Sequence, residues 1–550
     1  MSFSSISLSL AGAILLYTLW KVAPRWIDWY RSSLRDMPGP RRSSWLYGNL
    51  GDMRSEEPGV MLQRWVDRYG HVVRYKVSMN ADVVLMQDTK AINHVLTHSH
   101  DFPKPEIVRF NLGQILGKGL LVVEGEQHRQ QRRILNPAFG PVQIRGLTDV
   151  FVEKARQLRD IWQERLAQTG DEAQMDVVSG LNNMTLDVIG LAGFNYDFHS
   201  LNPEGKPNEL RHAFDVMFQV ISGSGLSLLG VLRARFPIAR IIPSKIASRM
   251  EDAQRVARRI GMQLIAEKRA AILRAAAATG EKEISGKGLL DRDLLTLLIK
   301  ANMSTDVPES QRLSDEDMLA QVPTFLVAGH ETTSTGTAWC LFALAQDPAV
   351  QTQLRDELWS VPTENPTMDE LNALPYLEAV VRETMRVYAP VSARSATRGA
   401  TPSSPSSGRT STPRATCAIA CGEIPKGTRV AIPIMPINKS RDLWGPDAHE
   451  FKPERWMTGT IPEAAHQIPG VWGNMLTFLG GPRACIGYRF SLIEMKALLF
   501  ALVRSFEFEL ALPKEEITKL AGLVDRPFVR AEKEKGARLP LKLKVHVRAE

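Results

Sequence analysis

The sequence predicts a mainly α-helical protein with small β-sheets, an α+β class, in which one large domain follows an N-terminal apolar segment. Helical patterns dominate beyond residue 40, and the β candidates are short, at residues 71–75, 82–87 and 429–434. No internal repeat of about 20 to 50 residues is visible, which disfavours solenoids and propellers. The 550 residues and the 44% hydrophobic content suffice for one sizeable core.

The composition excludes several classes of protein. A charged fraction of 23% beside 44% hydrophobic residues is typical of a folded chain and rules out a disordered or collagenous one. The net charge of +8 would suit nucleic acid, an anionic membrane or an acidic protein, but 60 acidic residues are mixed among the 68 basic ones, so we expect no nucleic-acid partner. Four cysteines without CxxC spacing predict neither a disulfide scaffold nor structural zinc, and they indicate a reducing compartment.

An uncharged, mostly apolar run covers residues 6–20. A membrane helix needs about 20 apolar residues, and residues 2–22 approach that length if Lys21 extends its amine toward the headgroups. Lys21 and three arginines follow the run and no charge precedes it, so the positive-inside rule places the rest of the chain in the cytosol. A cleaved signal peptide is the alternative, but a basic leading region and a clear cleavage site are both missing.

We therefore expect a single-pass transmembrane anchor over residues 1–22. Residues 23–40 are a basic, proline-containing hinge, because the Met-Pro-Gly-Pro sequence at its end breaks any helix and forces a stiff turn. Residues 41–550 are then the single large folded domain. Within it, residues 399–421 are crowded with Ser, Thr, Pro and Arg and lack hydrophobic periodicity, which indicates an atypical flexible loop.

The longest helical candidate spans residues 313–345. Ser314 can cap it, acidic residues occupy its first turn, and Asp347-Pro348 marks its end. Pro323 lies inside this pattern, so we expect a kink or irregular hydrogen bonding at that position.

Residues 478–487 combine glycines, a proline and one cysteine directly before a second long helical pattern, which continues to about residue 506. A thiolate at a helix start gains from the helix dipole and from free backbone N–H groups, which lower its pKa. A single thiolate suits an axial ligand of a large cofactor better than a four-ligand metal cage. Arg483 can pair with a cofactor carboxylate, and Gly481 and Gly487 can let a flat ring approach the backbone. The alternative for a lone cysteine is a small buried hydrophobic residue.

The pattern Phe-x-x-Gly-x-Arg-x-Cys-x-Gly over residues 478–487 resembles the haem-binding signature of the cytochrome P450 family at every fixed position. The resemblance implies the cytochrome P450 fold, with a single large haem domain. It also implies haem b as the cofactor and Cys485 as its axial thiolate, which pushes electron density toward the O–O bond. The other cofactor-binding positions that it implies in this loop are Phe478, Gly481, Arg483 and Gly487.

A further match lies in the long helix, where residues 328–333 read Ala-Gly-His-Glu-Thr-Thr. An acid followed by an alcohol in an apolar helix would cost free energy if these groups were buried without hydrogen-bond partners. Their presence therefore indicates a polar pocket or a water chain. The resemblance implies that Glu331 and Thr332 are the catalytic pair that delivers protons to oxygen at the haem. The alternative is that Thr332 only bonds back to the carbonyl four residues earlier. Gly329 would leave room for oxygen, and His330 is expected to be packed or solvent-linked.

Glu383 and Arg386 lie one helical turn apart in the stretch over residues 375–388, so they share a face and can form a bidentate pair. The resemblance implies that this pair, completed by Arg455, serves folding and haem retention and takes no part in a chemical step.

In residues 125–132, the resemblance implies that His128 and Arg132 bind a haem propionate. The family often has Trp where this chain has His128, but a neutral His can donate the same hydrogen bond. A further propionate-binding arginine is expected after the helix that holds Glu383, and we choose Arg394 over Arg398.

The resemblance extends from the anchor to about residue 512 and fails only at residues 399–421, where related sequences carry an Asp-x-Val-Ile-Pro-Leu strand and turn. We interpret this segment as a frameshifted or mis-spliced gene model. An intact transcript that encodes these residues would refute the idea.

The resemblance implies a fungal-like, membrane-anchored monooxygenase that inserts one oxygen atom of O₂ into a hydrophobic small molecule, with a terpenoid-like skeleton preferred. The implied partners are an NADPH-dependent flavoprotein reductase, cytochrome b5 and membrane lipid. The implied location is the endoplasmic reticulum membrane, with the catalytic domain cytosolic and a role in secondary metabolism. The alternatives are a haem-thiolate isomerase or peroxygenase that works without a reductase, and an inactive haem-binding remnant.

Overall fold

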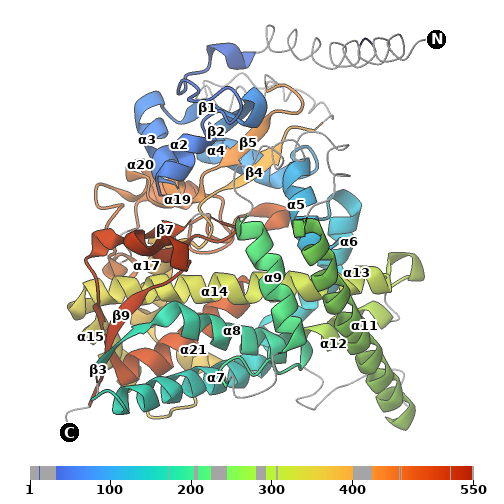
Figure 1. Cartoon of the computed structure of the whole chain (residues 1–550), viewed down its shortest axis with the longest axis vertical. Helices are drawn as coiled ribbons and strands as arrows, with labels where there is room; N and C mark the ends of the chain where they lie inside the picture. Colours follow the sequence, from blue (N-terminus) through green and yellow to red (C-terminus); the bar gives the residue numbers. More distant parts are fainter. Residues whose placement is uncertain are drawn as a thin grey trace.

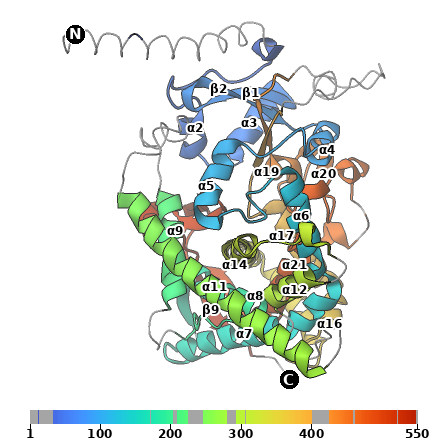
Figure 2. The same cartoon turned by 90° about the vertical axis from the view of Figure 1, so that its right-hand side faces the viewer.

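The chain forms a helical body with small sheets at its margins, as the computed structural model shows (Figures 1 and 2). This architecture is the mainly α class that the sequence predicts. The structure describes residues 12, 33–57, 59–170, 172–202, 208–223, 245–279, 293–304, 307–399, 424–457, 459, 461–520 and 522–547.

The core is built around α14 (Gln321–Gln346), which runs through the middle of the body and is seen end-on in Figure 2. This helix is buried along most of its length, because other helices surround it. The helices α8 (Val177–Phe194) and α21 (Tyr488–Ser505) pack against α14, and α7 (Pro141–Ala167) packs against α21. The loop before α21 is thereby fixed to the centre of the fold.

The remaining helices surround this core. The long α11 (Lys245–Thr279) packs along α9 (Glu209–Gly223) (Figure 2). The other α-helices of the described residues are α2 (Leu50–Ser55), α3 (Val60–Tyr69), α4 (Thr89–Thr97), α5 (Glu106–Leu116), α6 (Gly125–Leu135), α12 (Leu294–Met303), α13 (Asp315–Leu319), α15 (Pro348–Trp359), α16 (Met368–Asn372), α17 (Pro375–Val387), α19 (Ile434–Asn438) and α20 (Arg441–Trp444).

All three β candidates of the sequence form strands, and they share one four-stranded sheet in the order β1-β2-β5-β4. The strands β1 (Val72–Val77) and β2 (Ala81–Met86) form a hairpin, and β2 pairs in parallel with β5 (Arg429–Ile432). The edge strand β4 (Arg394–Thr397) is antiparallel to β5. Strand β4 therefore fixes the position of Arg394.

Two smaller sheets are formed mainly by the C-terminal part of the chain. The strands β3 (Glu172–Asp176) and β6 (Phe506–Leu510) flank β9 (Pro540–Val545), and both pairings are antiparallel. The strands β7 (Ile517–Leu520) and β8 (Arg526–Val529) form an antiparallel pair, and β8 also contacts α14. This contact brings the C-terminal part of the chain to the middle of the long helix.

The single helix predicted over residues 313–345 is two helices, so that prediction was wrong. A capping box between Ser314 and Asp317 starts α13, and α14 begins afresh at Gln321 after Ala320. Pro323 consequently lies in the first turn of α14. The first four N–H groups of a helix have no partner within it, so a proline there removes no helical hydrogen bond and no kink is needed. The irregular hydrogen bonding expected near Pro323 takes the form of this break between α13 and α14.

Most of the predicted anchor over residues 1–22 and of the atypical segment over 399–421 lies outside the described residues. Within the described part of the chain, α8 is the one helix long and apolar enough to cross a membrane. However, 67% of it is buried inside the body, where it packs on α14. We therefore interpret α8 as a core helix.

Candidate active site

The loop before α21 presents Cys485 at the start of that helix. The Cys485 amide donates a hydrogen bond to the Phe478 carbonyl (2.9 Å), which closes the loop on itself. The amide of Gly487 donates to the Cys485 sulfur. The helix α21 begins one residue later, so its positive end is directed at the sulfur.

The Cys485 side chain is solvent-accessible. Protein nevertheless surrounds it closely, and this partial desolvation raises the pKa of its thiol. The Gly487 N–H and the guanidinium groups of Arg132 and Arg394 act in the opposite direction and favour the thiolate. An accessible sulfur flanked by two cations is chemically suited to bind a metal as a thiolate.

The helix α6 contributes His128 and Arg132. The Arg132 guanidinium donates to the Ala484 carbonyl (2.6 Å), beside Cys485. Burial, reinforced by the charges of Lys104 and Arg483, lowers the pKa of His128 to about 4, so this imidazole is neutral at physiological pH. A neutral imidazole carries one N–H donor, as the sequence analysis requires for this position.

Arg483 already has partners within the protein. Its guanidinium donates to the carbonyls of Ser99 and Phe102, each at 2.7 Å, and forms an ion pair with Glu124. Glu124 was missed by the sequence analysis, because it lies more than 350 residues away and no motif marks it. The predicted contact of Arg483 with a cofactor carboxylate stays a prediction.

The two candidate arginines after α17 differ in their surroundings. Arg394, in β4, is close enough to Cys485 for their charges to interact, and burial lowers the pKa of its guanidinium. Arg398 lies over the Phe102 ring, 5.2 Å from its centroid. The structure thus places Arg394 near the sulfur, and its predicted bond to a haem carboxylate stays a prediction.

Two glycines of the loop, Gly481 and Gly487, differ in how closely the surrounding protein packs against them. Gly481 has φ +67°, and a Cβ there would lie 2.6 Å from the Leu96 carbonyl oxygen in α4. Gly487 has ordinary backbone angles, and a Cβ there would be 3.7 Å from the Phe139 ring. Close packing against α4 explains Gly481 without a cofactor, so the predicted approach of a flat ring stays a prediction at both positions. Phe478 packs against the Trp472 and Tyr488 rings.

The middle of α14 carries the predicted acid and alcohol. Ala328 and Thr332, one turn apart, are accessible on a helix that is otherwise mostly buried. The Thr332 hydroxyl donates to the Ala328 carbonyl (2.7 Å), which is the alternative that the sequence left open. The hydroxyl oxygen can still accept a hydrogen bond from a proton donor through its lone pairs.

Glu331 points to a different side of α14, where Arg526 of β8 donates to its Oε1 at 2.5 Å. Arg526 was also missed, because nothing in the local sequence links β8 to α14. The predicted role of Gly329 needs correction: a Cβ there would lie 2.8 Å from two side-chain atoms of Ile189 in α8. The missing side chain makes room for α8, so helix packing accounts for this glycine.

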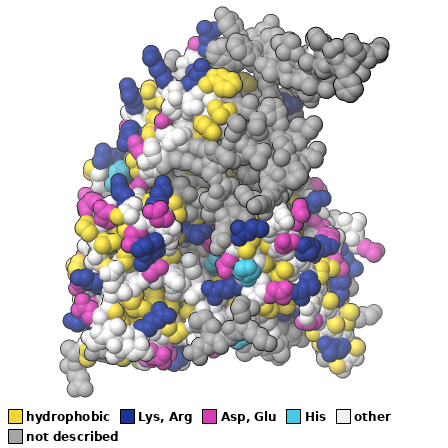
Figure 3. All heavy atoms as spheres, viewed as in Figure 1, with side chains coloured by type: hydrophobic (Ala, Val, Ile, Leu, Met, Phe, Trp, Pro, Cys, Tyr) yellow, Lys and Arg dark blue, Asp and Glu magenta, His cyan; other side chains and the backbone are white. Residues whose placement is uncertain are grey.

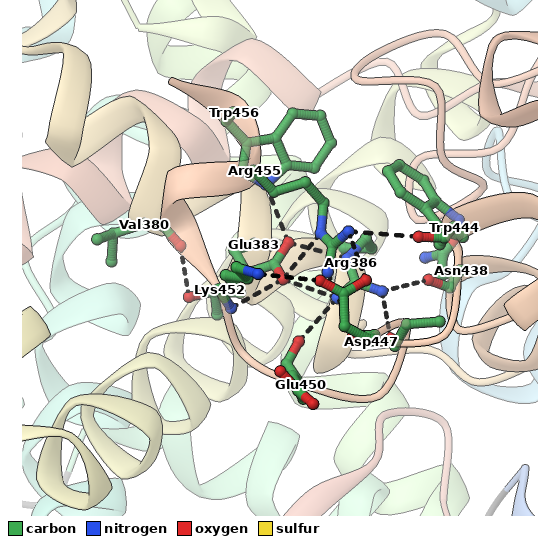
Figure 4. A network of polar contacts seen from close by, with 12 residues as sticks. Val380, Glu383, Arg386, Asn438, Trp444, Asp447, Glu450, Lys452, Arg455 and Trp456 are labelled. Atoms are coloured by element: carbon green, nitrogen blue, oxygen red, sulfur yellow. Dashed lines mark hydrogen bonds and ion pairs between the residues drawn. The ribbon is translucent and has the colours of Figure 1, made fainter. Parts of the chain in front are cut away.

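The pair Glu383 and Arg386 is the centre of a buried network (Figure 4). Arg386 donates two hydrogen bonds to the carboxylate, at 2.7 and 2.8 Å, and Arg455 lies 3.6 Å from it. The Trp456 indole N–H donates a further bond at 2.9 Å. The same guanidinium of Arg386 also binds three backbone carbonyls, of Asn438, Ala448 and Glu450. The network ties α17 to the segment that precedes the cysteine loop.

The donor set fits the cofactor implied by the resemblance. A thiolate-capable sulfur is accessible inside the fold, and the cationic side chains of Arg132 and Arg394 stand beside it. Such a set matches an iron porphyrin, whose iron takes one axial thiolate and whose carboxylates need cationic or N–H partners.

Comparison with known proteins agrees with this chemistry. The family model of cytochrome P450 matches residues 37–527. Cytochrome P450 monooxygenases 205 and 128 of Postia placenta are 55% and 56% identical to the chain, and each alignment covers 98% of both proteins. Cytochrome P450 monooxygenase claW of Ampulloclitocybe clavipes is 34% identical over 93% of both chains. The predicted likeness to fungal proteins is confirmed.

Proposed function

Because the chain belongs to the cytochrome P450 family and is a cytochrome P450 monooxygenase of the haem-thiolate type, we propose that Cys485 is the axial ligand of its haem. The observation that carries this assignment is the accessible Cys485 sulfur at the start of α21, with Arg132 and Arg394 beside it. Of the two cysteines described, Cys340 is fully enclosed in α14 and burial raises the pKa of its thiol to about 12, which makes it unsuited to bind iron.

The remaining residues of the site hold the cofactor. His128, Arg132 and Arg394 bind the haem carboxylates by N–H donation, and Arg483 closes the loop beside them. Phe478, Gly481 and Gly487 shape the backbone around the sulfur. When bound, the haem supplies an iron centre that activates O₂. The buried network of Glu383, Arg386 and Arg455 keeps the loop in place and thereby retains the haem.

Glu331 and Thr332 supply protons to the reaction. The reaction RH + O₂ + 2H⁺ + 2e⁻ → ROH + H₂O consumes two protons, which must come from solvent through the protein. The Thr332 hydroxyl can accept a hydrogen bond while it donates to Ala328, so it can hold a proton donor in place. Glu331 is the adjacent titratable group.

We assign the finer features of the function as follows. The electrons come from an NADPH-dependent flavoprotein reductase, with cytochrome b5 as a second donor. The substrate is a hydrophobic small molecule with a terpenoid-like skeleton, of the kind made in secondary metabolism. Residues 1–22 anchor the protein in the endoplasmic reticulum membrane, and residues 41–550 form the cytosolic catalytic domain.

The purified holoenzyme tests these assignments in two steps. Spectral titration against a panel of a terpene, a sterol and a fatty acid identifies the class of substrate that displaces water from the site. Product formation is then compared between NADPH with reductase and O₂, and hydrogen peroxide alone. Oxygenation that requires the reductase supports the monooxygenase cycle. Product with peroxide alone would favour the peroxygenase, and no product with any panel member would favour an inactive remnant.

A further inference from the structure

An aromatic row formed by Trp472, Phe478 and Tyr488 lies beside the cysteine loop. The Trp472 and Phe478 rings meet edge to face, with centroids 5.6 Å apart and planes at 72°. The Phe478 ring is in turn 5.9 Å from the Tyr488 ring. All three side chains are partly buried, so the row lies between the solvent and the interior. Trp472 precedes the signature over residues 478–487 and belongs to no motif of the sequence.

An arginine lies over the ring at each end of the aromatic row. The guanidinium carbon of Arg382 is 5.4 Å from the Trp472 centroid, and that of Arg489 is 4.5 Å from the Tyr488 centroid. On the face drawn in Figure 3, by contrast, Lys and Arg side chains lie among Asp and Glu side chains. A cation over the face of a ring is attracted by the quadrupole of that ring. The two guanidinium groups therefore hold the ends of the row.

Arg382 is itself held from the interior of the protein. Its Nε donates to one carboxylate oxygen of Glu378 at 2.6 Å, and Lys496 of α21 pairs with the other oxygen at 2.8 Å. The Lys496 side chain is 3% exposed, so it fixes this carboxylate from the buried side. The Arg382 guanidinium also lies 5.6 Å from the Trp456 ring. Arg382 thus ties Trp472 to both α17 and α21.

The turn that carries Trp472 packs tightly on the cysteine loop. The Val471 amide donates to the Leu479 carbonyl at 2.8 Å. A Cβ at Gly480 would lie 1.8 Å from the Pro469 carbonyl oxygen, so no side chain fits between the turn and the loop at that point. Leu479 has φ +54°, a left-handed backbone conformation that is costly for a leucine. Strain of this kind persists only where the surrounding contacts impose it, and the turn supplies such contacts.

The backbone connects the aromatic row with the sulfur. The Phe478 carbonyl accepts the Cys485 amide at 2.9 Å, and the Gly487 amide donates to the sulfur. Hydrogen bonds to a ligating sulfur and its exposure to water set the reduction potential of the iron that it binds. A shift of Phe478 would therefore change both the loop and the access of water to it.

We propose that Trp472, held by Arg382, is a positioning residue that fixes Phe478, keeps water from the protein side of the cysteine loop and thereby sets the reduction potential of the haem iron. The proposal rests on the proposed function, since it needs Cys485 to bind the iron. Reduction of the ferric iron takes up one electron and leaves the centre with one more negative charge. A water that donates to the sulfur stabilises that charge, so opening the row makes the potential more positive.

The first experiment is a redox titration of the purified holoenzyme, in which dithionite reduces the ferric haem in the presence of mediator dyes. We expect Trp472→Ala to have a more positive midpoint potential than the unmodified enzyme. Trp472→Phe keeps a ring against Phe478 and should restore most of the difference. Arg382→Met keeps a long side chain but removes the charge, and we expect a smaller shift in the same direction.

The matched control is Trp359→Ala. Trp359 is also partly buried and also has an arginine over its ring, because the Arg504 guanidinium carbon lies 4.2 Å from its centroid. However, Arg504 is at the opposite end of α21 from Cys485. We expect this variant to keep the midpoint potential of the unmodified enzyme.

The second readout needs neither substrate nor reductase. Resonance Raman spectra of the ferric holoenzyme report the iron–sulfur stretching frequency. A hydrogen bond from water to the sulfur weakens the iron–sulfur bond, so we expect a lower frequency in Trp472→Ala and an unchanged frequency in Trp359→Ala. A purely structural role of Trp472 would lower the fraction of haem retained without moving the frequency or the potential of the haem that remains.

An unchanged or more negative potential in Trp472→Ala, with an unchanged stretching frequency, would overturn the proposal. If Trp472→Ala does not retain haem, Arg382→Met decides in its place, and the absence of a positive shift there would overturn it equally. Failure of the proposed function is a different result, because the unmodified enzyme would then lack the thiolate-type carbon monoxide spectrum before any variant is compared.

Discussion

Glu383 and Arg386 are both fully buried in α17, and two hydrogen bonds of 2.7 and 2.8 Å join them in a bidentate pair. The carboxylate receives further donors from Trp456 and from the Lys452 amide, so nearly every lone pair and N–H of the pair is used. This completeness is what makes a buried charge pair tolerable in a protein interior.

Removing one charge of this pair should be strongly destabilising. Glu383→Gln leaves the Arg386 cation buried without its counter-charge, and we expect the free energy of unfolding to fall by about 3–5 kcal/mol. Urea titration of the purified protein and the fraction of haem retained are the measurements. The control is Arg145→Ala, which breaks an exposed ion pair with Asp369 and should cost about 1 kcal/mol or less. Equal stability of the two variants would contradict this account.

Thr332 and Thr337 provide a matched pair in α14, because each hydroxyl donates to the carbonyl four residues earlier, at 2.7 and 2.9 Å. If Thr332 also positions protons, Thr332→Ala should lower the product formed per NADPH by about tenfold or more, with the electrons recovered in hydrogen peroxide. Thr337→Ala should keep the yield of product per NADPH. Equal yields in the two variants would show that Thr332 has only the backbone role.

Gly329→Ala should test whether helix packing explains that glycine. A Cβ would lie 2.8 Å from two Ile189 atoms, so we expect a loss of about 1–3 kcal/mol in the free energy of unfolding. Ile189→Ala alone should cost about 2–5 kcal/mol through a cavity. In the double variant the new methyl group partly fills that cavity, so the combined loss should be smaller than the sum of the single losses. Additive losses would argue against the packing explanation.

Asp525 should make stability depend on pH in an unusual direction. Burial raises its pKa from 3.8 to about 6, only partly opposed by the charge of Lys519. The folded state then binds the proton more tightly than the unfolded state, so its contribution is complete below about pH 4 and is lost as the pH rises to about 6. The loss is of the order of 3 kcal/mol, and Asp525→Asn should abolish it.

The control for this measurement is Asp447, whose pKa is lowered by hydrogen bonds from Arg455 and Lys452. Its contribution should have the opposite sign, present at higher pH and lost in acid. Thermal unfolding midpoints of the two asparagine variants and the unmodified protein, recorded from about pH 2 to about pH 7, separate the effects. A pH profile of Asp525→Asn that parallels the unmodified protein would refute the assignment.

The parts of the site that the sequence could predict are local. Glu383 and Arg386 lie one helical turn apart, so helical periodicity identifies them as a pair. Cys485 lies in a motif of ten consecutive residues, so the sequence pattern alone identifies it. The strands β1 and β2 could also be predicted, because apolar residues alternate within each segment whichever strand it pairs with.

The parts that could not be predicted depend on tertiary packing. Arg526 reaches Glu331 across 195 residues and Glu124 reaches Arg483 across 359, and no periodic signal connects either pair. The break between α13 and α14 was missed because Ala320 keeps nearly helical backbone angles while the hydrophobic pattern continues. The sequence does not show that a side chain at Gly329 would clash with Ile189, because that contact depends on where α8 packs. Gly329 was therefore assigned to the site.

The axial role of Cys485 is tested most directly by the carbon monoxide spectrum of the reduced protein, recorded for the unmodified enzyme and for Cys485→Ser. We predict a red-shifted Soret band typical of a haem-thiolate in the unmodified enzyme and its loss in the variant. An identical band in the two proteins would show that another residue binds the iron, and would contradict the site described above.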